Sequence, residues 1–147
     1  MYRATTHGFG ADAFHSHCDG RARLLVLTRA QEGGWLFGGF TAVGFSPPRR
    51  YYADPASFLF SLTSSLGRPE KLESKRTGLD LYYGPSACAT FGGCPADLGI
   101  CAYTDRKADS YTSTGRAYEA PAATGPHPMA QGTETGWHAA EIVAWVV

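Results

Sequence analysis

Hydrophobic and polar positions along this chain alternate over short stretches, as is typical of β-strands. The apolar run at 24–27 is unbroken, which predicts a strand buried on both faces. The next stretch alternates and predicts a second strand, one face of which carries Trp35, Phe37, Gly39, Thr41, Val43 and Phe45. The adjacent Gly38 and Gly39 in this strand indicate a bulge, or the close approach of another backbone or a bulky ring. The two strands together predict a hairpin.

The rest of the chain continues this arrangement of short strands. Further strands are predicted at 58–62, 79–83 and 98–103, and β-branched residues favour a strand over a helix at 137–147. A one-sided apolar stripe predicts one helix, over 10–18. The polar segment 67–78 is predicted to be a surface connection. The segment 105–136 shows little periodicity, and within it residues 120–128 are predicted to form an irregular surface loop.

These elements predict a mainly β fold with minor α content. We expect a two-layer antiparallel β-sandwich with short flanking helices, forming a single domain over residues 1–147. The side chains expected in its core include Leu25, Leu27, Phe37, Phe58, Phe60, Ile100 and Ile142.

Composition and charge narrow the class of protein. The chain has 147 residues, 44% of them hydrophobic, which is enough for the core of one domain. Its 13 basic residues balance 13 acidic ones, and this argues against a nucleic-acid binder or a polybasic membrane-surface protein. There is no apolar run long enough for membrane insertion and no signal-peptide pattern near the start, so we expect a cytoplasmic protein.

The chemistry-bearing residues form no complete motif for a metal, cofactor or catalytic site. Residues 8–13 imitate a dinucleotide fingerprint but lack the preceding buried strand. On the predicted helix only His15 and Cys18 share a face, so a zinc site is not expected, and the imidazoles are expected to be exposed. The segment 49–52 (Arg-Arg-Tyr-Tyr) resembles a single-strand nucleic-acid patch, but an edge loop with solvated arginines is the favoured interpretation.

The four cysteines match no zinc or redox spacing. They are expected to be reduced thiols, with a Cys88–Cys94 or Cys94–Cys101 disulfide as the alternative.

Six short motifs follow one another along the chain. They are Tyr2-Arg3-Ala4 with His7-Gly8-Phe9; Ala13-Phe14-His15 with Cys18-Asp19-Gly20; Leu25-Val26-Leu27 before Trp35-Leu36-Phe37-Gly38-Gly39-Phe40; the segment from Asp54-Pro55 to Leu62; Thr90-Phe91-Gly92-Gly93 with Asp97-Leu98; and Ser110-Tyr111 with Tyr118-Glu119. In this order and spacing the chain resembles the TLDc domain family over essentially its whole length. Two departures are Cys88-Ala89, where the family usually has Gly-Pro, and Val143, where it commonly has a second acid.

The resemblance implies a β-sandwich that acts as a non-enzymatic protein-interaction module without a cofactor or metal. It implies links to oxidative-stress protection and a protein partner, a subunit of the vacuolar proton-pumping ATPase. The candidate binding residues in the matching motifs are Gly38, Gly39, Phe91, Gly92, Gly93, Asp97 and Glu141. The four glycines are expected to meet backbone or packing constraints rather than to bind phosphate. For Glu141, a carboxylate that is hydrogen-bonded to nearby backbone is as well supported as a role in binding a partner.

Two other functions stay open on the sequence. One is a redox-active or hydrolytic enzyme, in which a cysteine and a histidine come together in the fold. The other is a small-ligand binding domain. The distances among the cysteines and histidines distinguish the enzyme from the interaction module.

Overall fold

A computed structural model describes residues 1–63, 68–120 and 135–147. Its elements in chain order are β1 (Tyr2–Arg3), α1 (Ala4–His7), α2 (Ala11–Cys18), β2 (Leu24–Ala30), β3 (Leu36–Thr41), β4 (Arg50–Tyr52), β5 (Phe58–Thr63), β6 (Glu70–Glu73), β7 (Leu81–Tyr83), β8 (Ala87–Phe91), β9 (Leu98–Cys101), β10 (Ser110–Thr112), β11 (Thr135–Trp137) and β12 (Ala139–Val146).

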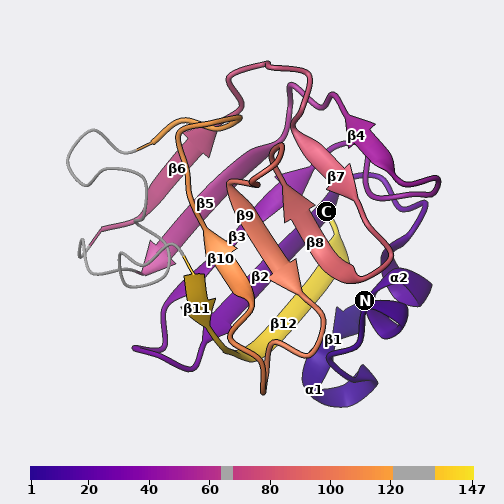
Figure 1. Ribbon diagram of the computed structural model, residues 1–147, viewed down its shortest axis with the longest axis vertical. Coiled ribbons are helices and arrows are strands. Elements are labelled where there is room, and N and C mark those ends of the chain that lie inside the picture. Colours follow the sequence, from indigo (N-terminus) through magenta and orange to yellow (C-terminus); the bar gives the residue numbers. More distant parts are fainter. Residues whose placement is uncertain (64–67, 121–134) are drawn as a thin grey trace.

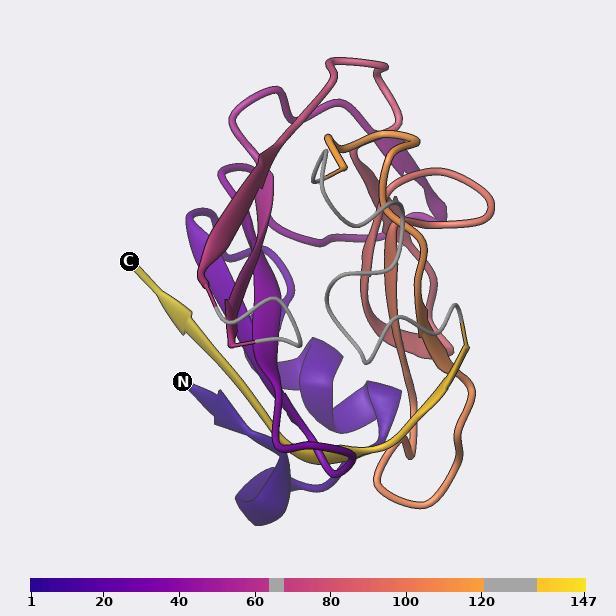
Figure 2. The same ribbon diagram turned by 90° about the vertical axis from the view of Figure 1, so that its left-hand side faces the viewer.

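The strands form two antiparallel sheets that face each other (Figures 1 and 2). The first, sheet A, has the order β1-β12-β2-β3-β5-β6, and the second, sheet B, has the order β11-β10-β9-β8-β7-β4. Only His138 separates β11 from β12, so the chain passes from sheet B to sheet A there. The predicted two-layer antiparallel sandwich with short helices is confirmed.

Helix α2 closes one end of the space between the sheets, as Figure 2 shows. Phe14 and Cys18, on one side of the helix, are fully buried, as the apolar stripe predicted. The helix α1 had no signal in the hydrophobic pattern. Neither helix of the described segments has the length or the apolar run that crossing a bilayer needs.

Aromatic rings fill the core between the sheets. The Phe45 ring meets the Phe91 ring edge-on at 5.7 Å, and Phe37 meets Trp137 in the same way at 5.0 Å. Phe37 on β3 and Trp137 on β11 belong to opposite sheets, and Phe45, in the loop after β3, contacts Phe91 of sheet B. Both ring contacts therefore help to fix how the layers stack.

The predicted burial is confirmed at Phe37, Phe60, Ile100 and Ile142 and is wrong at Leu25, Leu27 and Phe58, which are only partly buried. In β2 the core side chains are Leu24 and Val26, whereas Leu25 and Leu27 are only partly buried. Sheet B packs against one face of sheet A alone, so an unbroken apolar run does not place both faces inside. The same reason leaves Phe58 partly buried, although Phe60 is 92% buried.

The predicted strand 35–45 ends earlier, at Thr41. The Asp54 carboxylate accepts the backbone N–H of Ala42 at 2.8 Å, and the Thr41 hydroxyl accepts that of Gly44 at 2.8 Å. These bonds turn the chain, and Val43 becomes half-exposed instead of facing the core.

Short strands also form in segments where no strand was predicted, and residues 121–128 of the predicted surface loop lie outside the described residues. β4 and β6 are edge strands, and β10 and β11 lie in the weakly periodic segment. Edge strands bury little, so hydrophobic alternation does not mark them. The Arg50 guanidinium lies 4.4 Å from the centre of the Tyr52 ring, so this arginine is not simply solvated.

Candidate functional site

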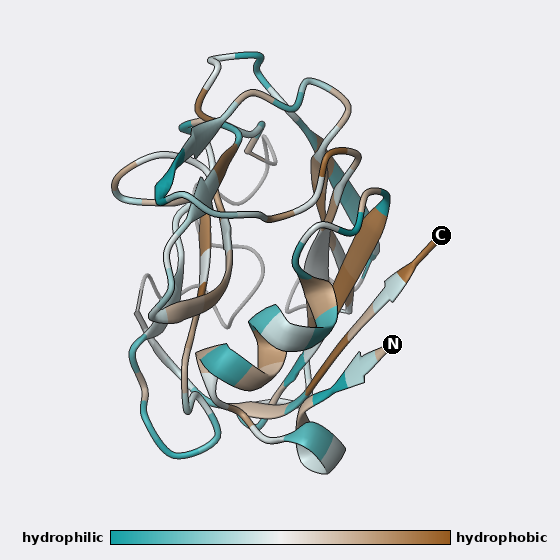
Figure 3. Cartoon of the chain, turned by 90° about the vertical axis from the view of Figure 1, so that its right-hand side faces the viewer, coloured by the Kyte–Doolittle hydropathy of each residue, from teal (hydrophilic) through white to brown (hydrophobic). Residues whose placement is uncertain are grey.

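We call the outer surface of sheet A face A. It carries every second side chain of these strands, namely those that point away from the core. Strand register aligns them in rows across the sheet. One row is Trp145, Leu25, Phe40, Phe58 and Glu73, and the next is Val143, Leu27, Gly38, Phe60 and Lys71. In Figure 3, strands of this sheet near the labelled C-terminus are coloured brown, which marks hydrophobic residues. Face A is therefore largely apolar although it has no second layer among the described residues.

Face A is hollowed. The depression has a volume of about 530 Å³, and its lining is Leu25, Leu27, Phe58, Phe60, Leu62, Pro69, Glu70, Lys71 and Trp145. Gly38 contributes to this shape because it pairs with Leu27 on one side and Phe60 on the other and places no side chain between them. A substituent there is excluded, since a Cβ on Gly38 would lie 1.9 Å from the Val26 carbonyl oxygen.

The acidic side chains of face A already have cationic partners. The Lys71 ammonium lies 2.6 Å from the Glu73 carboxylate and 4.4 Å from the centre of the Phe58 ring. Arg68 pairs with Glu70 at 2.7 Å. Such exposed pairs contribute little to stability, about 0.2–1 kcal/mol each, but they determine which charges remain for a partner.

Glu141 lies at the end of this face where α1 begins. Its carboxylate accepts the Thr5 hydroxyl at 2.7 Å and the Thr5 backbone N–H at 3.1 Å. The guanidinium of Arg3 lies 3.8 Å away. Glu141 therefore makes the kind of backbone contact that was the alternative to binding, and its binding role stays a prediction.

The other predicted site residues lie inside the fold or at one turn. Gly39 faces the core, where a Cβ would lie 2.6 Å from Phe91 Cζ, and Phe91 itself is fully buried. This is the close approach of a bulky ring that the glycine pair indicated. At Gly92, φ is +100° and a Cβ would lie 2.5 Å from an Asp97 carboxylate oxygen.

Asp97 is a buried carboxylate that holds a loop. It accepts the backbone N–H groups of Arg116, Ala117 and Tyr118 at 2.9–3.2 Å. Burial raises the pKa of Asp97, and these hydrogen bonds act in the opposite direction. The structure thus brings together Gly39 with Phe91 and Gly92 with Asp97, places Gly93 beside them, and leaves Gly38 and Glu141 on face A.

Reasoning from sequence missed the lining of the hollow, because Leu25, Leu27, Phe58 and Phe60 were assigned to the core. A signal was present in β2, where Leu24 and Val26 alternate with Leu25 and Leu27, so that both faces are apolar and only one can pack against sheet B. In β5 the more apolar side, which carries Phe58 and Phe60, is the one turned outward, and Leu59 and Ser61 face the core. Two apolar faces on an antiparallel strand are unusual, since such sheets commonly expose one polar face.

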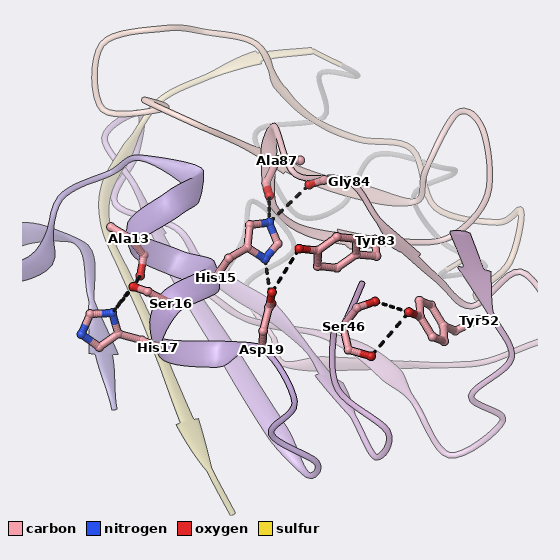
Figure 4. Close-up of polar contacts among 10 residues, drawn as sticks. All are labelled: Ala13, His15, Ser16, His17, Asp19, Ser46, Tyr52, Tyr83, Gly84 and Ala87. Atoms are coloured by element: carbon pink, nitrogen blue, oxygen red, sulfur yellow. Dashed lines mark hydrogen bonds and ion pairs between the residues drawn. The ribbon is translucent and has the colours of Figure 1, made fainter. Parts of the chain in front are cut away.

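The two histidines expected to be exposed on α2, His15 and His17, are both partly buried and engaged in the fold (Figure 4). His17 Nδ1 lies 2.8 Å from the Ala13 carbonyl oxygen. His15 is 11% exposed; its Nδ1 lies 2.7 Å from Asp19 Oδ1 and its Nε2 lies 2.9 Å from the Ala87 carbonyl oxygen. The Tyr83 hydroxyl donates to the other Asp19 oxygen at 3.1 Å. Because both ring nitrogens are occupied, His15 joins α2 to sheet B rather than standing free as a base.

All four cysteines are unpaired, as expected from the sequence. Burial raises the pKa of Cys18 and of Cys88 to about 12, and it also raises the pKa of Cys101. A thiol acts as a nucleophile in its thiolate form, so burial disfavours the reactive form of all three. Among the described residues, no three His, Cys, Asp or Glu side chains come together as a metal site.

A family model described as the TLDc domain matches residues 1–128. No curated protein matches the chain.

Proposed function

The chain belongs to the TLDc domain family, and from this premise we propose that it acts as a non-enzymatic protein-interaction module that docks partners on face A. The observation that carries the proposal is the apolar hollow of about 530 Å³ in that face. Contiguous exposed apolar surface is costly in water and marks interaction sites in folded proteins. A sandwich of two hydrogen-bonded sheets presents such a surface without rearrangement.

The chemistry of the described thiols and of His15 supports an interaction module over an enzyme. An enzyme that uses a cysteine and a histidine needs a thiolate within reach of a base. Three of the thiols have a raised pKa, and both nitrogens of His15 contact oxygens of the fold. A small-ligand domain is also less well supported, because a ligand pocket usually encloses 70–90% of its ligand and the hollow is open along one side.

We further propose, from the family resemblance, that the partner is a subunit of the vacuolar proton-pumping ATPase in the cytoplasm, and that this interaction serves oxidative-stress protection. Residues 1–147 would act in it as one domain. Val143 lies in an apolar row of face A, so the second acid of the family motif is replaced here by a side chain that extends the apolar surface.

The test compares two variants with matched substitutions. Leu62 borders the hollow and Leu79 lies elsewhere, and both side chains are 45% exposed. We expect tagged Leu62→Lys protein to lose capture of proton-pump subunits from lysate by about tenfold or more, because the ammonium would be buried in an apolar contact. Leu79→Lys should capture them as the unmodified protein does. Equal capture by both variants contradicts docking on face A.

Turnover assays test the non-enzymatic part of the proposal. We expect no saturable turnover of peroxide or ester substrates. Turnover that disappears on replacing Cys94, the exposed thiol, would show an enzyme instead.

A further inference from the structure

We propose that the segment bound in the hollow of face A is an amphipathic α-helix of the partner, carrying an acidic side chain that pairs with Arg29. This inference rests on the proposed docking function and names the chemistry of what docks.

The backbone of face A favours a helix over an extended segment. The hollow lies over β2 and β5, and each of these strands has hydrogen-bonded neighbours on both sides. A β-strand of a partner binds by adding to a sheet edge that offers free N–H and C=O groups, and the middle of face A offers none. A helix satisfies its own backbone hydrogen bonds and needs only apolar contacts from the surface below it.

The size of the hollow also suits a helix. Its lining extends from Trp145 on β12 to Lys71 on β6, across a run of five neighbouring strands. At about 4.8 Å per strand this is roughly 19 Å, the length of about 13 helical residues. Side chains at spacings i, i+3, i+4 and i+7 of such a helix would enter the depression beside Gly38.

Charge determines which helix fits. Each acidic side chain of face A pairs with a cation: Glu73 with Lys71, Glu70 with Arg68, and Glu141 with Arg3. Arg29 is exposed and lies opposite Glu141 in the pairing of β2 with β12, but the Glu141 carboxylate contacts Thr5 and Arg3 instead. In the described parts of the chain Arg29 makes no hydrogen bond or ion pair. It follows Leu27 by two residues on the same face of β2, which is about 7 Å along the strand.

This charge arrangement disfavours a second copy of the chain as the occupant. Two copies meeting through face A would bring apolar surface together, but the acids of each face are already paired. A partner helix with an unpaired Glu or Asp beside its apolar stripe supplies what the face lacks.

The experiment uses the full chain and three synthetic 18-residue peptides. The first places Leu on one helical face with one Glu beside that stripe; the second replaces this Glu by Lys; the third scrambles the first so that no apolar face forms. Binding is measured by fluorescence anisotropy and located by amide chemical shifts. We expect the first peptide to bind, with shifts at Leu25, Leu27 and Leu62, and the scrambled peptide to bind at least tenfold more weakly.

A charge exchange gives the sharper test. Arg29→Glu should weaken binding of the Glu-containing peptide by about 1.5–5-fold, the range for an exposed ion pair. The same variant should strengthen binding of the Lys-containing peptide by a similar factor. Arg116, exposed at another hollow, provides the matched control, and Arg116→Glu should change neither. Equal binding of the scrambled peptide, or the same response to both arginine variants, overturns the proposal.

The experiments can distinguish an error in the helix proposal from an error in the proposed docking surface. If Leu62→Lys abolishes capture of cellular partners while none of the peptides binds, face A docks a partner of other chemistry, and the helix proposal is wrong. Sedimentation that shows a dimer lost in Leu62→Lys would assign face A to a second copy, and saturable binding of a fatty acid at the same residues would assign it to a small apolar ligand. Either result overturns the helix.

Discussion

The ring of Phe91 on β8 packs directly against the backbone of Gly39 on β3, so that a Cβ on Gly39 would lie 2.6 Å from Phe91 Cζ. This contact crosses the interior from sheet B to sheet A. The distance between the layers at this point therefore depends on the absence of a side chain at residue 39.

We expect Gly39→Ala to lower the free energy of unfolding by about 1–3 kcal/mol, because the added methyl group overpacks the core. Urea unfolding followed by fluorescence measures this. Gly93→Ala is the control: the Cβ there would have its nearest neighbour at 3.5 Å, and little change is expected. Equal losses in the two variants would show that the Phe91 contact is not the cause.

The hydrogen bonds of His15 and Tyr83 to Asp19 give a second prediction. Tyr83→Phe removes one hydrogen bond to Asp19 and should cost about 0.5–1.5 kcal/mol. His15→Ala should cost more, about 1–3 kcal/mol, because it leaves the Ala87 carbonyl and the Asp19 carboxylate without that donor. Chemical denaturation of both variants and of the double variant checks this. Strict additivity would contradict the coupling through Asp19.

Thiol reactivity should follow burial. At pH 7.5 we expect an aromatic disulfide reagent to modify Cys94 rapidly, since it is the exposed cysteine. Cys18 and Cys88 should react only after unfolding, because burial raises the pKa of both to about 12. Cys94→Ala should remove the rapid phase. Rapid modification of Cys18 or Cys88 in that variant would contradict the burial of these two thiols.

Stability should depend on pH through Glu32. Burial acts to raise its pKa, but hydrogen bonds from the His138 ring and backbone N–H outweigh it and bring the pKa below the usual 4.5. A lowered folded-state pKa stabilises the fold above the unfolded-state pKa, and this contribution is lost as the pH falls through the folded-state pKa. For a pair this exposed we expect about 0.2–1 kcal/mol.

The variant Glu32→Gln tests this dependence. It should be less stable than the unmodified chain at pH 6, and the difference should shrink as the pH falls to about 3. Thermal unfolding at a series of pH values measures it. A difference that stays constant over this range would contradict the assignment to Glu32.

The sequence by itself determined the family, the antiparallel sandwich and much of its interior. Phe37, Ile100 and Ile142 were correctly placed in the core, because local alternation specifies which side of a strand is apolar. The glycine pair at 38 and 39 also predicted a close contact, since glycine inside a strand often marks a place where another group approaches closely.

Only the tertiary structure decided which apolar face became the core. β2 is apolar on both sides, and β5 turns its more apolar side outward and buries Leu59 and Ser61, because local pattern holds no information about which side a second sheet will cover. Leu25, Leu27 and Phe58, which were predicted in the core, therefore lie on face A. The edge strands β4 and β6, and the pairing of Glu141 with Thr5, depend on contacts between residues far apart in the chain, so no local pattern of polarity specifies them.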